Sequence, residues 1–228
     1  MKNVEITLYD IFGYLIPGCT AIIGIYLIAW WLFLPLNQDW SNVSLIGWIA
    51  FVGVAYVIGH FVQALSNVLC RFWFKDKVEQ ILVDPSLIPS NVLPLAKNAA
   101  RCVIGLSDNE SLEVKTLNEI MDNYIQHYGR NDIRDIYVYR EGFYRGLSVA
   151  LFIFAFGALI HITGGQRFIA VFGVNIMISK SFMGFTAILS IIMAFFMFMR
   201  YRRFTIHRVR NCLYSFLITF NTKKEGVL

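Results

Sequence analysis

The chain of 228 residues is 57% hydrophobic and only 15% charged, and it has a formal net charge of +5. A water-soluble protein carries about a quarter charged residues, so this composition excludes an ordinary soluble domain. It indicates instead that much of the chain faces lipid.

Four uninterrupted apolar stretches account for the composition. The first covers residues 11–34 and carries no charge, and the second covers residues 45–65. The third and fourth cover about residues 146–163 and 182–199. A helix of about 20 residues crosses the hydrocarbon of a bilayer, and continuous apolar runs favour helices over barrel strands. The sequence therefore predicts an all-α membrane protein with four transmembrane helices.

The first stretch contains a proline between two glycines. Pro17 should kink or loosen the helix because proline has no backbone N–H to donate. Gly13 and Gly18 permit another helix to approach closely. This segment predicts a helix that packs tightly.

The second stretch carries a polar face. Its members recur at helical spacing and so share one side of the helix, namely Tyr56, Gly59, His60 and Gln63. Polar groups are costly against lipid, so this face is predicted to line the interior of the bundle. The favoured interpretation is hydrogen bonding between helices beside a close-packing glycine. The alternative is a water-filled path with a proton-sensing His60.

The segment between the second and third stretches looks helical. The second helix is expected to continue through residues 66–82, and three prolines then predict a loop. Two further helices are expected over residues 98–104 and 107–128. A last helix from Asn131 should run unbroken into the third stretch, after Gly129 ends the preceding helix.

The helix expected at 107–128 has an acidic outer face. The carboxylates of Glu113, Glu119 and Asp122 lie on it, with Lys115 as the nearby opposite charge. Most charged faces are simply solvated. This face is nevertheless the predicted docking site for a basic cytosolic partner.

The connection between the third and fourth stretches is unusually apolar. Residues 168–178 are too few to cross a bilayer as a helix. Three structures fit the pattern: a segment lying in the interface, a re-entrant segment, or a small hairpin.

The distribution of Lys and Arg predicts the orientation. Eighteen of the 20 lie in residues 66–145, in the tail after Met199, or at the N-terminus. Positive charge stays in the cytoplasm, so both termini are predicted to be cytoplasmic. The cytoplasmic part is then residues 66–145 and 200–228, as helical extensions and a small helical domain. Together with the bundle they are predicted to form one domain, residues 1–228.

The tail after the fourth stretch is rich in arginine. Its cluster serves stop-transfer topology and could bind anionic lipid headgroups, through Arg200, Arg202, Arg203, Arg208 and Arg210. Arg202 and His207 also form R-x-x-x-x-H, which resembles the catalytic motif of HEPN ribonucleases, but the stop-transfer interpretation is preferred. No catalytic residue, cofactor site or metal site is predicted, and the positive charge does not predict direct nucleic-acid binding.

Four motifs together resemble a diffuse group of small bacterial multispan proteins. They are YDIFGYLIPG at 9–18, GHFVQALSN at 59–67, REGFYRG at 140–146 and RYRRFTIHRVR at 200–210. Some members of the group resemble membrane components of anti-phage defence, such as the membrane subunit of the Kiwa system or membrane accessories of RNA-targeting CRISPR loci. The resemblance implies a bacterial inner-membrane protein that forms homo-oligomers and works with a cytosolic protein partner.

The sequence leaves three functions open. The first is a sensor or scaffold that detects a membrane event and signals to the partner. The second is a pore-forming effector with a path lined by the His60 face. The third is a membrane-tethered ribonuclease that uses Arg202 and His207.

Overall fold

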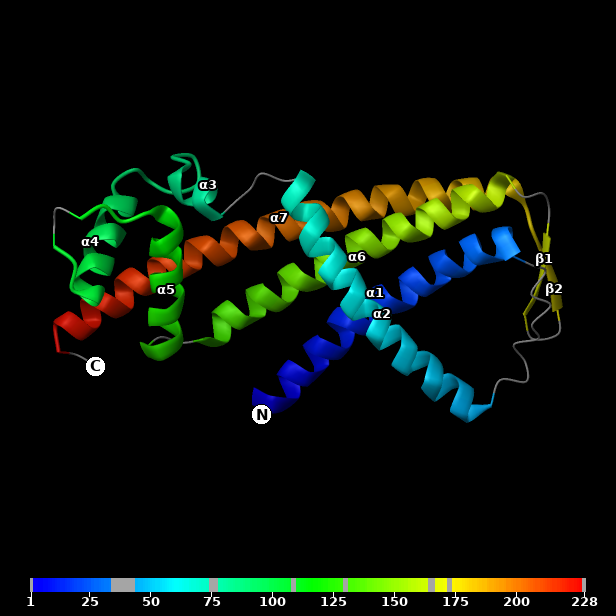
Figure 1. The fold of residues 1–228 in the computed structure, drawn as a ribbon, viewed down its shortest axis with the longest axis horizontal. Coiled ribbons are helices and arrows are strands. Elements are labelled where there is room, and N and C mark those ends of the chain that lie inside the picture. The colour runs from blue at the N-terminus through cyan, green and yellow to red at the C-terminus, as the bar shows by residue number, and fades with distance from the viewer. Residues whose placement is uncertain are drawn as a thin grey trace. The chain divides into compact units, whose positions relative to one another are not determined.

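The computed structural model describes residues 2–33, 44–73, 78–107, 110–128, 131–163, 167–171 and 174–226 (Figure 1). Apart from one hairpin, the elements in this part of the chain are helices. In chain order they are α1 (Lys2–Phe33), α2 (Leu45–Trp73), α3 (Val78–Val83), α4 (Val92–Ile104), α5 (Val114–Tyr128), α6 (Asn131–Thr163), β1 (Arg167–Val171), β2 (Val174–Ile178) and α7 (Lys180–Lys224).

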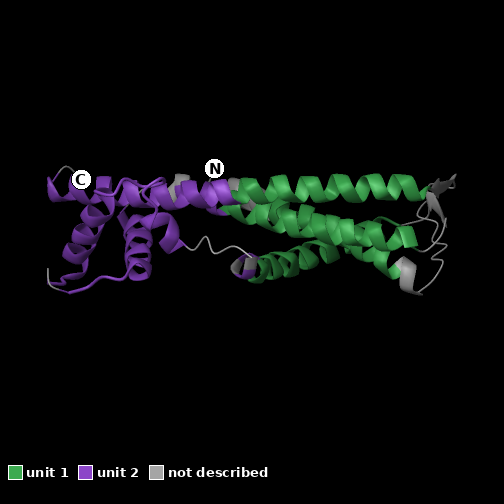
Figure 2. Ribbon diagram, turned by 90° about the horizontal axis from the view of Figure 1, so that it is seen from above, with its two compact units in different colours: residues 1–69, 139–201 green, residues 70–138, 202–228 purple. Residues whose placement is uncertain are grey.

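The chain forms two compact units (Figure 2). Unit 1 contains residues 1–69 and 139–201, and unit 2 contains residues 70–138 and 202–228. Helices α6 and α7 each contribute residues to both units. Whether the two units fold as the single domain predicted from the sequence stays a prediction.

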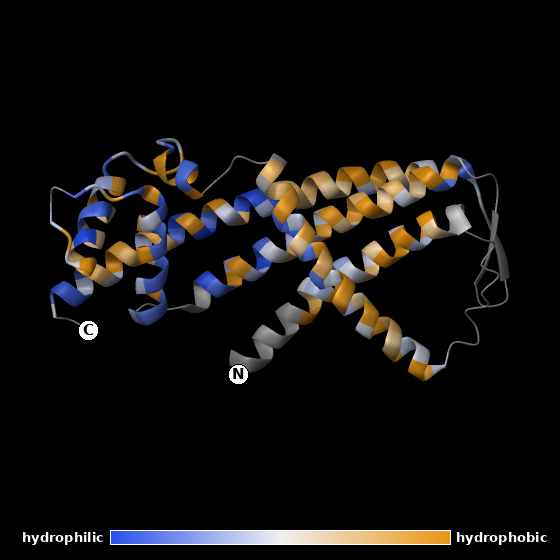
Figure 3. Ribbon diagram, in the orientation of Figure 1, coloured by the Kyte–Doolittle hydropathy of each residue, from blue (hydrophilic) through white to orange (hydrophobic). Residues whose placement is uncertain are grey.

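Four helices are long and apolar enough to cross a membrane. They are α1, α2, α6 and α7, which confirms the four predicted helical stretches. Their membrane-length parts are predominantly apolar (Figure 3). Less than half of the most apolar window of each helix is buried, and the share is only 17% in α2. Large exposed side chains such as Ile49, Phe61 and Phe185 are therefore available to lipid.

Glycines set how closely the helices of unit 1 approach. Helices α1 and α2 cross in Figure 1, and a Cβ added to Gly18 would overlap the Ala55 carbonyl. A Cβ on Gly59 would likewise overlap the Tyr14 carbonyl. Helices α1 and α6 meet at Gly24 and Gly157, where the same addition would strike backbone. Small residues permit these backbone contacts, as at many helix interfaces in membranes.

A hairpin joins α6 to α7. Strands β1 and β2 pair antiparallel, from Arg167 opposite Ile178 to Val171 opposite Val174. Of the three structures that the sequence left open for this connection, the structure has the hairpin.

Unit 2 has a core of the kind found in soluble helical domains. Helix α5 buries the residues at its i, i+4 and i+8 positions, Leu117, Met121 and Ile125, and α7 buries Val209, Leu213 and Phe216. Alanines of α4 and the apolar residues Ile81 and Leu82 of α3 belong to the same cluster. The polar and apolar positions of α4 and α5 alternate around these helices in Figure 3, as expected for amphipathic helices.

Helix boundaries in unit 2 differ from the sequence prediction. Helix α2 covers Leu45–Trp73 and α3 covers Val78–Val83, within the stretch where one helix was expected, and the predicted continuation between them lies outside the described residues. Helix α4 begins at Val92 and takes Pro94 into its first turn, where a missing N–H costs no helical hydrogen bond. It ends at Ile104, and the following Gly105 has a φ of 72°, a left-handed conformation that favours glycine. Helix α5 begins only at Val114, and the predicted role of Gly129 lies outside the described residues.

Candidate functional site

A side chain of α2 donates a hydrogen bond to a backbone carbonyl of α1 that lacks its usual helical donor. Pro17 has no N–H, so the carbonyl of Gly13, four residues earlier, lacks its normal helical donor. Gln63 Nε2 donates to that carbonyl at 3.2 Å. The amide therefore satisfies an acceptor that the proline leaves open.

The same amide reaches a third helix. Gln63 Nε2 also donates to the Gly142 carbonyl of α6 at 2.7 Å, so both of its N–H groups are used. Gly146 leaves room for the side chain, because a Cβ there would meet Nε2 at 2.5 Å. Gln63 thus links α1, α2 and α6.

Charged residues of α6 continue the polar contacts made by Gln63. Ser66 is fully buried, and its Oγ donates to the Gln63 carbonyl at 2.7 Å. Arg145 Nε donates to Ser66 Oγ at 3.2 Å, and Arg145 Nη1 lies 3.9 Å from Glu141 Oε1. The guanidinium also lies 5.7 Å from the centroid of the Tyr201 ring. Sequence reasoning missed Glu141 and Arg145, although their i, i+4 spacing was a visible signal.

The other members of the predicted polar face pack against Tyr14 of α1. The His60 ring stacks on Tyr14 with centroids 3.8 Å apart, and Tyr56 meets Tyr14 edge-on at 5.8 Å. Both His60 and Tyr56 keep one side exposed. Gly59 is buried at the crossing of α1 and α2. The structure therefore places Gly59 and Gln63 between helices, and His60 and Tyr56 at the margin.

The link between Pro17 and Gln63 predicts a coupled pair of substitutions. Gln63→Leu should lower stability by about 1–3 kcal/mol, because it leaves the Gly13 carbonyl without a donor. In a Pro17→Ala background the cost should fall by about 1 kcal/mol, because the N–H of the new alanine can donate to Gly13. Thermal unfolding of the four proteins in detergent measures the coupling. An equal cost of Gln63→Leu in both backgrounds would contradict it.

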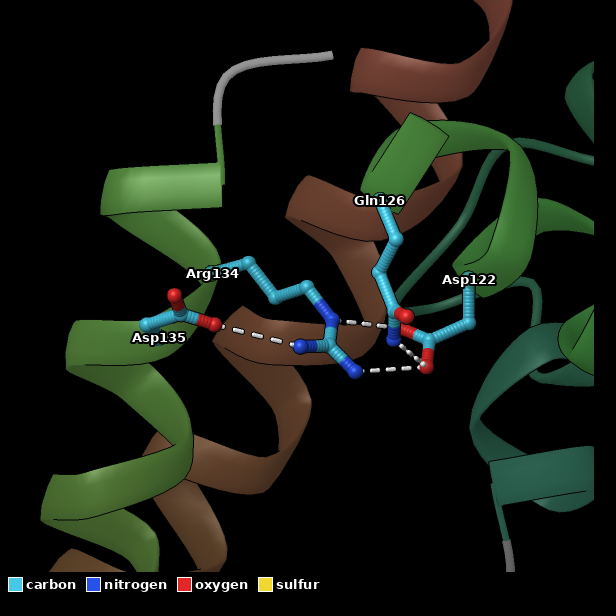
Figure 4. A network of polar contacts seen from close by, with 4 residues as sticks. All are labelled: Asp122, Gln126, Arg134 and Asp135. Carbon is cyan, nitrogen blue, oxygen red and sulfur yellow. Dashed lines mark hydrogen bonds and ion pairs between the residues drawn. The ribbon is translucent and has the colours of Figure 1, made fainter. Parts of the chain in front are cut away.

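The acidic face predicted on α5 is partly engaged within unit 2 (Figure 4). Arg134 holds Asp122 by two hydrogen bonds of 2.6 Å and also donates to Asp135 at 3.2 Å. Bonding to Asp122 raises the pKa of the Arg134 guanidinium above its ordinary value. Gln126 donates to Asp122 as well, at 3.3 Å. Of the three predicted docking carboxylates, Glu113 and Glu119 are exposed and Asp122 is half-buried. Glu113 lies just before α5 and not on it.

The predicted headgroup-binding arginines lie along α7. Arg200, Arg202 and Arg203 are exposed, whereas Arg208 and Arg210 are half-buried.

The two members of the R-x-x-x-x-H motif also lie on α7. Five residues turn an α-helix by about 140° beyond a full circle, so Arg202 and His207 leave it in different directions. The His207 ring lies against Tyr137, with centroids 6.1 Å apart.

Nothing in the described residues suggests a metal centre, because no group of three or more His, Cys, Asp or Glu gathers there.

Comparison of the chain with protein families, with curated proteins and with solved structures found no match.

Proposed function

We propose that the chain is a homo-oligomeric protein of the bacterial inner membrane. In this proposal it senses a membrane event and scaffolds or signals to a cytosolic partner as part of anti-phage defence. Four helices of sufficient length and apolarity support the membrane location. The defence role rests on the resemblance of the four sequence motifs.

The observation that carries the sensor role is the extent of α6 and α7. Each helix has residues in the apolar unit 1 and in unit 2, which has a core of its own. A change in helix packing within unit 1 therefore has two continuous helices along which to act on unit 2. A purely structural anchor would need no second core.

The outer face of α2 is the proposed contact between copies. The glycines Gly18, Gly24 and Gly59 are used for packing within the chain, whereas a Cβ on Gly53 would meet nothing within 4 Å. Gly53 lies on an exposed apolar face with Ile49 and Val57. A small residue on such a face permits a second copy to approach closely. Copies inserted in one orientation close naturally into a cyclic ring.

Particle mass tests the assembly. The protein in nanodiscs should have a mass of several copies, and Gly53→Leu should lower that mass because its side chain would separate the copies. Mass photometry measures both proteins. A monomeric parent in nanodiscs and in mild detergent would overturn the proposed ring and the function built on it.

A separate experiment tests the predicted orientation of the chain in the membrane. Cys102 is exposed on α4, and 18 of the 20 basic residues favour a cytoplasmic position for this part of the chain. A membrane-impermeant maleimide should therefore label Cys102 in inverted vesicles and not in intact spheroplasts. Labelling of Cys102 from outside would overturn the whole topology.

A pore is the second candidate. The exposed sides of His60 and Tyr56 on α2 favour it, because polar groups in a span favour a wet surface. Ion flux from liposomes containing the oligomer separates a pore from a sensor. No described contact favours the ribonuclease.

A further inference from the structure

An open groove lies on unit 2 where the C-terminal parts of α4, α5 and α7 meet. Two cavities of about 310 Å³ and 470 Å³ form it, and both are lined by Val103, Tyr124 and Tyr128. Because they share these residues, the cavities make one continuous depression.

The floor of the groove is apolar and exposed. Ile104 is 45% exposed and Tyr128 is 49% exposed. The aromatic rings of Tyr124 and Phe220 continue this surface, with centroids 6.5 Å apart. A contiguous apolar patch on a protein surface often marks an interaction site, whereas single exposed apolar residues usually do not.

The rim of the groove is basic. Lys223 and Lys224 line it on the α7 side, and Lys223 Nζ lies 3.3 Å above the centroid of the Tyr128 ring. His127 lines the first cavity, and no residue that lines either cavity is acidic. The charge of this surface is therefore opposite to that of the exposed Glu119 on α5 and of Glu113 just before that helix.

We propose that this groove binds an acidic amphipathic helix of the cytosolic partner. The apolar residues of that helix would cover Val103, Ile104 and Tyr128, and its carboxylates would meet Lys223 and Lys224. Laying the apolar face of a helix in an apolar groove is a recurrent mode of recognition, and the basic rim selects an acidic helix over a basic one. This inference rests on the proposed function, because it requires a cytosolic partner, and it places that partner in the groove and not on the acidic α5 face.

Synthetic peptides test the assignment on the full-length protein in nanodiscs. The probe is an 18-residue helix with Leu on one face and Glu on the other, carrying a fluorophore. A matched peptide has Lys in place of each Glu, and a third has the acidic composition in scrambled order. Fluorescence anisotropy gives the affinities, and protection of the native Cys102 from maleimide reports binding in the groove, because Cys102 lines it.

The acidic amphipathic peptide should bind at least about tenfold more tightly than the other two, a ratio that two rim charge pairs can supply. It should also slow the labelling of Cys102. The double variant Lys223→Glu, Lys224→Glu should reverse the preference toward the basic peptide. The control variant Lys97→Glu, Lys115→Glu makes the same charge change on unit 2 away from the groove and should leave the preference unchanged.

Several results of the peptide experiment would overturn the assignment. They are equal binding of the acidic and basic peptides, loss of binding in the control variant, and binding that leaves Cys102 unprotected. A fall in particle mass in the Lys223→Glu, Lys224→Glu variant would mean that the groove joins copies of this chain, which also overturns it. Failure of the peptide to bind an oligomer of normal mass rejects the groove alone, whereas a monomeric parent rejects the proposed function.

Discussion

Gly59→Leu should leave little correctly folded protein. The Cβ of the new side chain would overlap the Tyr14 carbonyl, so the backbones of α1 and α2 could not keep their crossing. Overpacking usually costs about 1–3 kcal/mol, and a clash with backbone costs more because no rotamer relieves it. The measurement is the yield of monodisperse protein in detergent, together with its unfolding temperature.

Gly53→Leu is the matched control, since it makes the same substitution on the same helix in open space. It should keep the parent's yield of folded, monodisperse protein, at the lower particle mass expected when the contact between copies is lost. If Gly59→Leu instead remained folded and only the particle mass fell, the crossing of α1 and α2 seen within the chain would be wrong, and Gly59 would join separate copies.

Phe216→Ala should open unit 2. The ring is fully buried and meets Tyr124 edge-on at 5.3 Å. Removing a buried phenylalanine costs about 3–5 kcal/mol. Because about 1.4 kcal/mol is a factor of ten, the open form of unit 2 should become at least about a hundredfold more populated.

A native cysteine reports that opening. Cys212 is buried in the same core, and burial raises the pKa of its thiol from 9.0 to about 12. It should therefore resist maleimide at neutral pH until unit 2 opens, because the thiolate is the reactive form. The labelling rate of Cys212 should rise at least about a hundredfold in Phe216→Ala, whereas Ile218→Ala, at a side chain that is 66% exposed, should leave it unchanged. Equal Cys212 labelling in the parent and Phe216→Ala would show that this core does not hold unit 2 closed.

The raised pKa of the Cys212 thiol also makes the stability of unit 2 depend on pH. The thiol ionises at lower pH in the unfolded chain than in the folded one, so the contribution of Cys212 is complete below pH 9.0 and declines as the pH rises toward about 12.

The apolar helices could be predicted from the sequence because their signal is local. A run such as residues 11–34 needs no knowledge of its neighbours to be identified as long and apolar. The continuation of α6 from Asn131 into the apolar stretch, and the helical extension of α7 beyond the fourth stretch, could also be predicted from periodicity.

The connections within the candidate site depend on contacts far apart in the chain. Gln63 was identified as polar within an apolar run, but its acceptors lie 50 and 79 residues away. The acidic pattern on α5 was visible, whereas the Arg134 that holds Asp122 comes from the next helix. The groove was missed because its residues come from three helices, none of which shows a motif there.

The bond between Gln63 and the Gly13 carbonyl also constrains the order in which these positions can change in evolution. A lineage that first replaces Pro17 restores the helical donor to Gly13, and Gln63 then becomes free to vary. A lineage that first loses Gln63 must pass through a protein with an unsatisfied buried carbonyl, at a cost of about 1–3 kcal/mol. Among descendants of this chain, proline at position 17 without a hydrogen-bond donor at position 63 should therefore be rare. A donor at position 63 without proline at position 17 should be common.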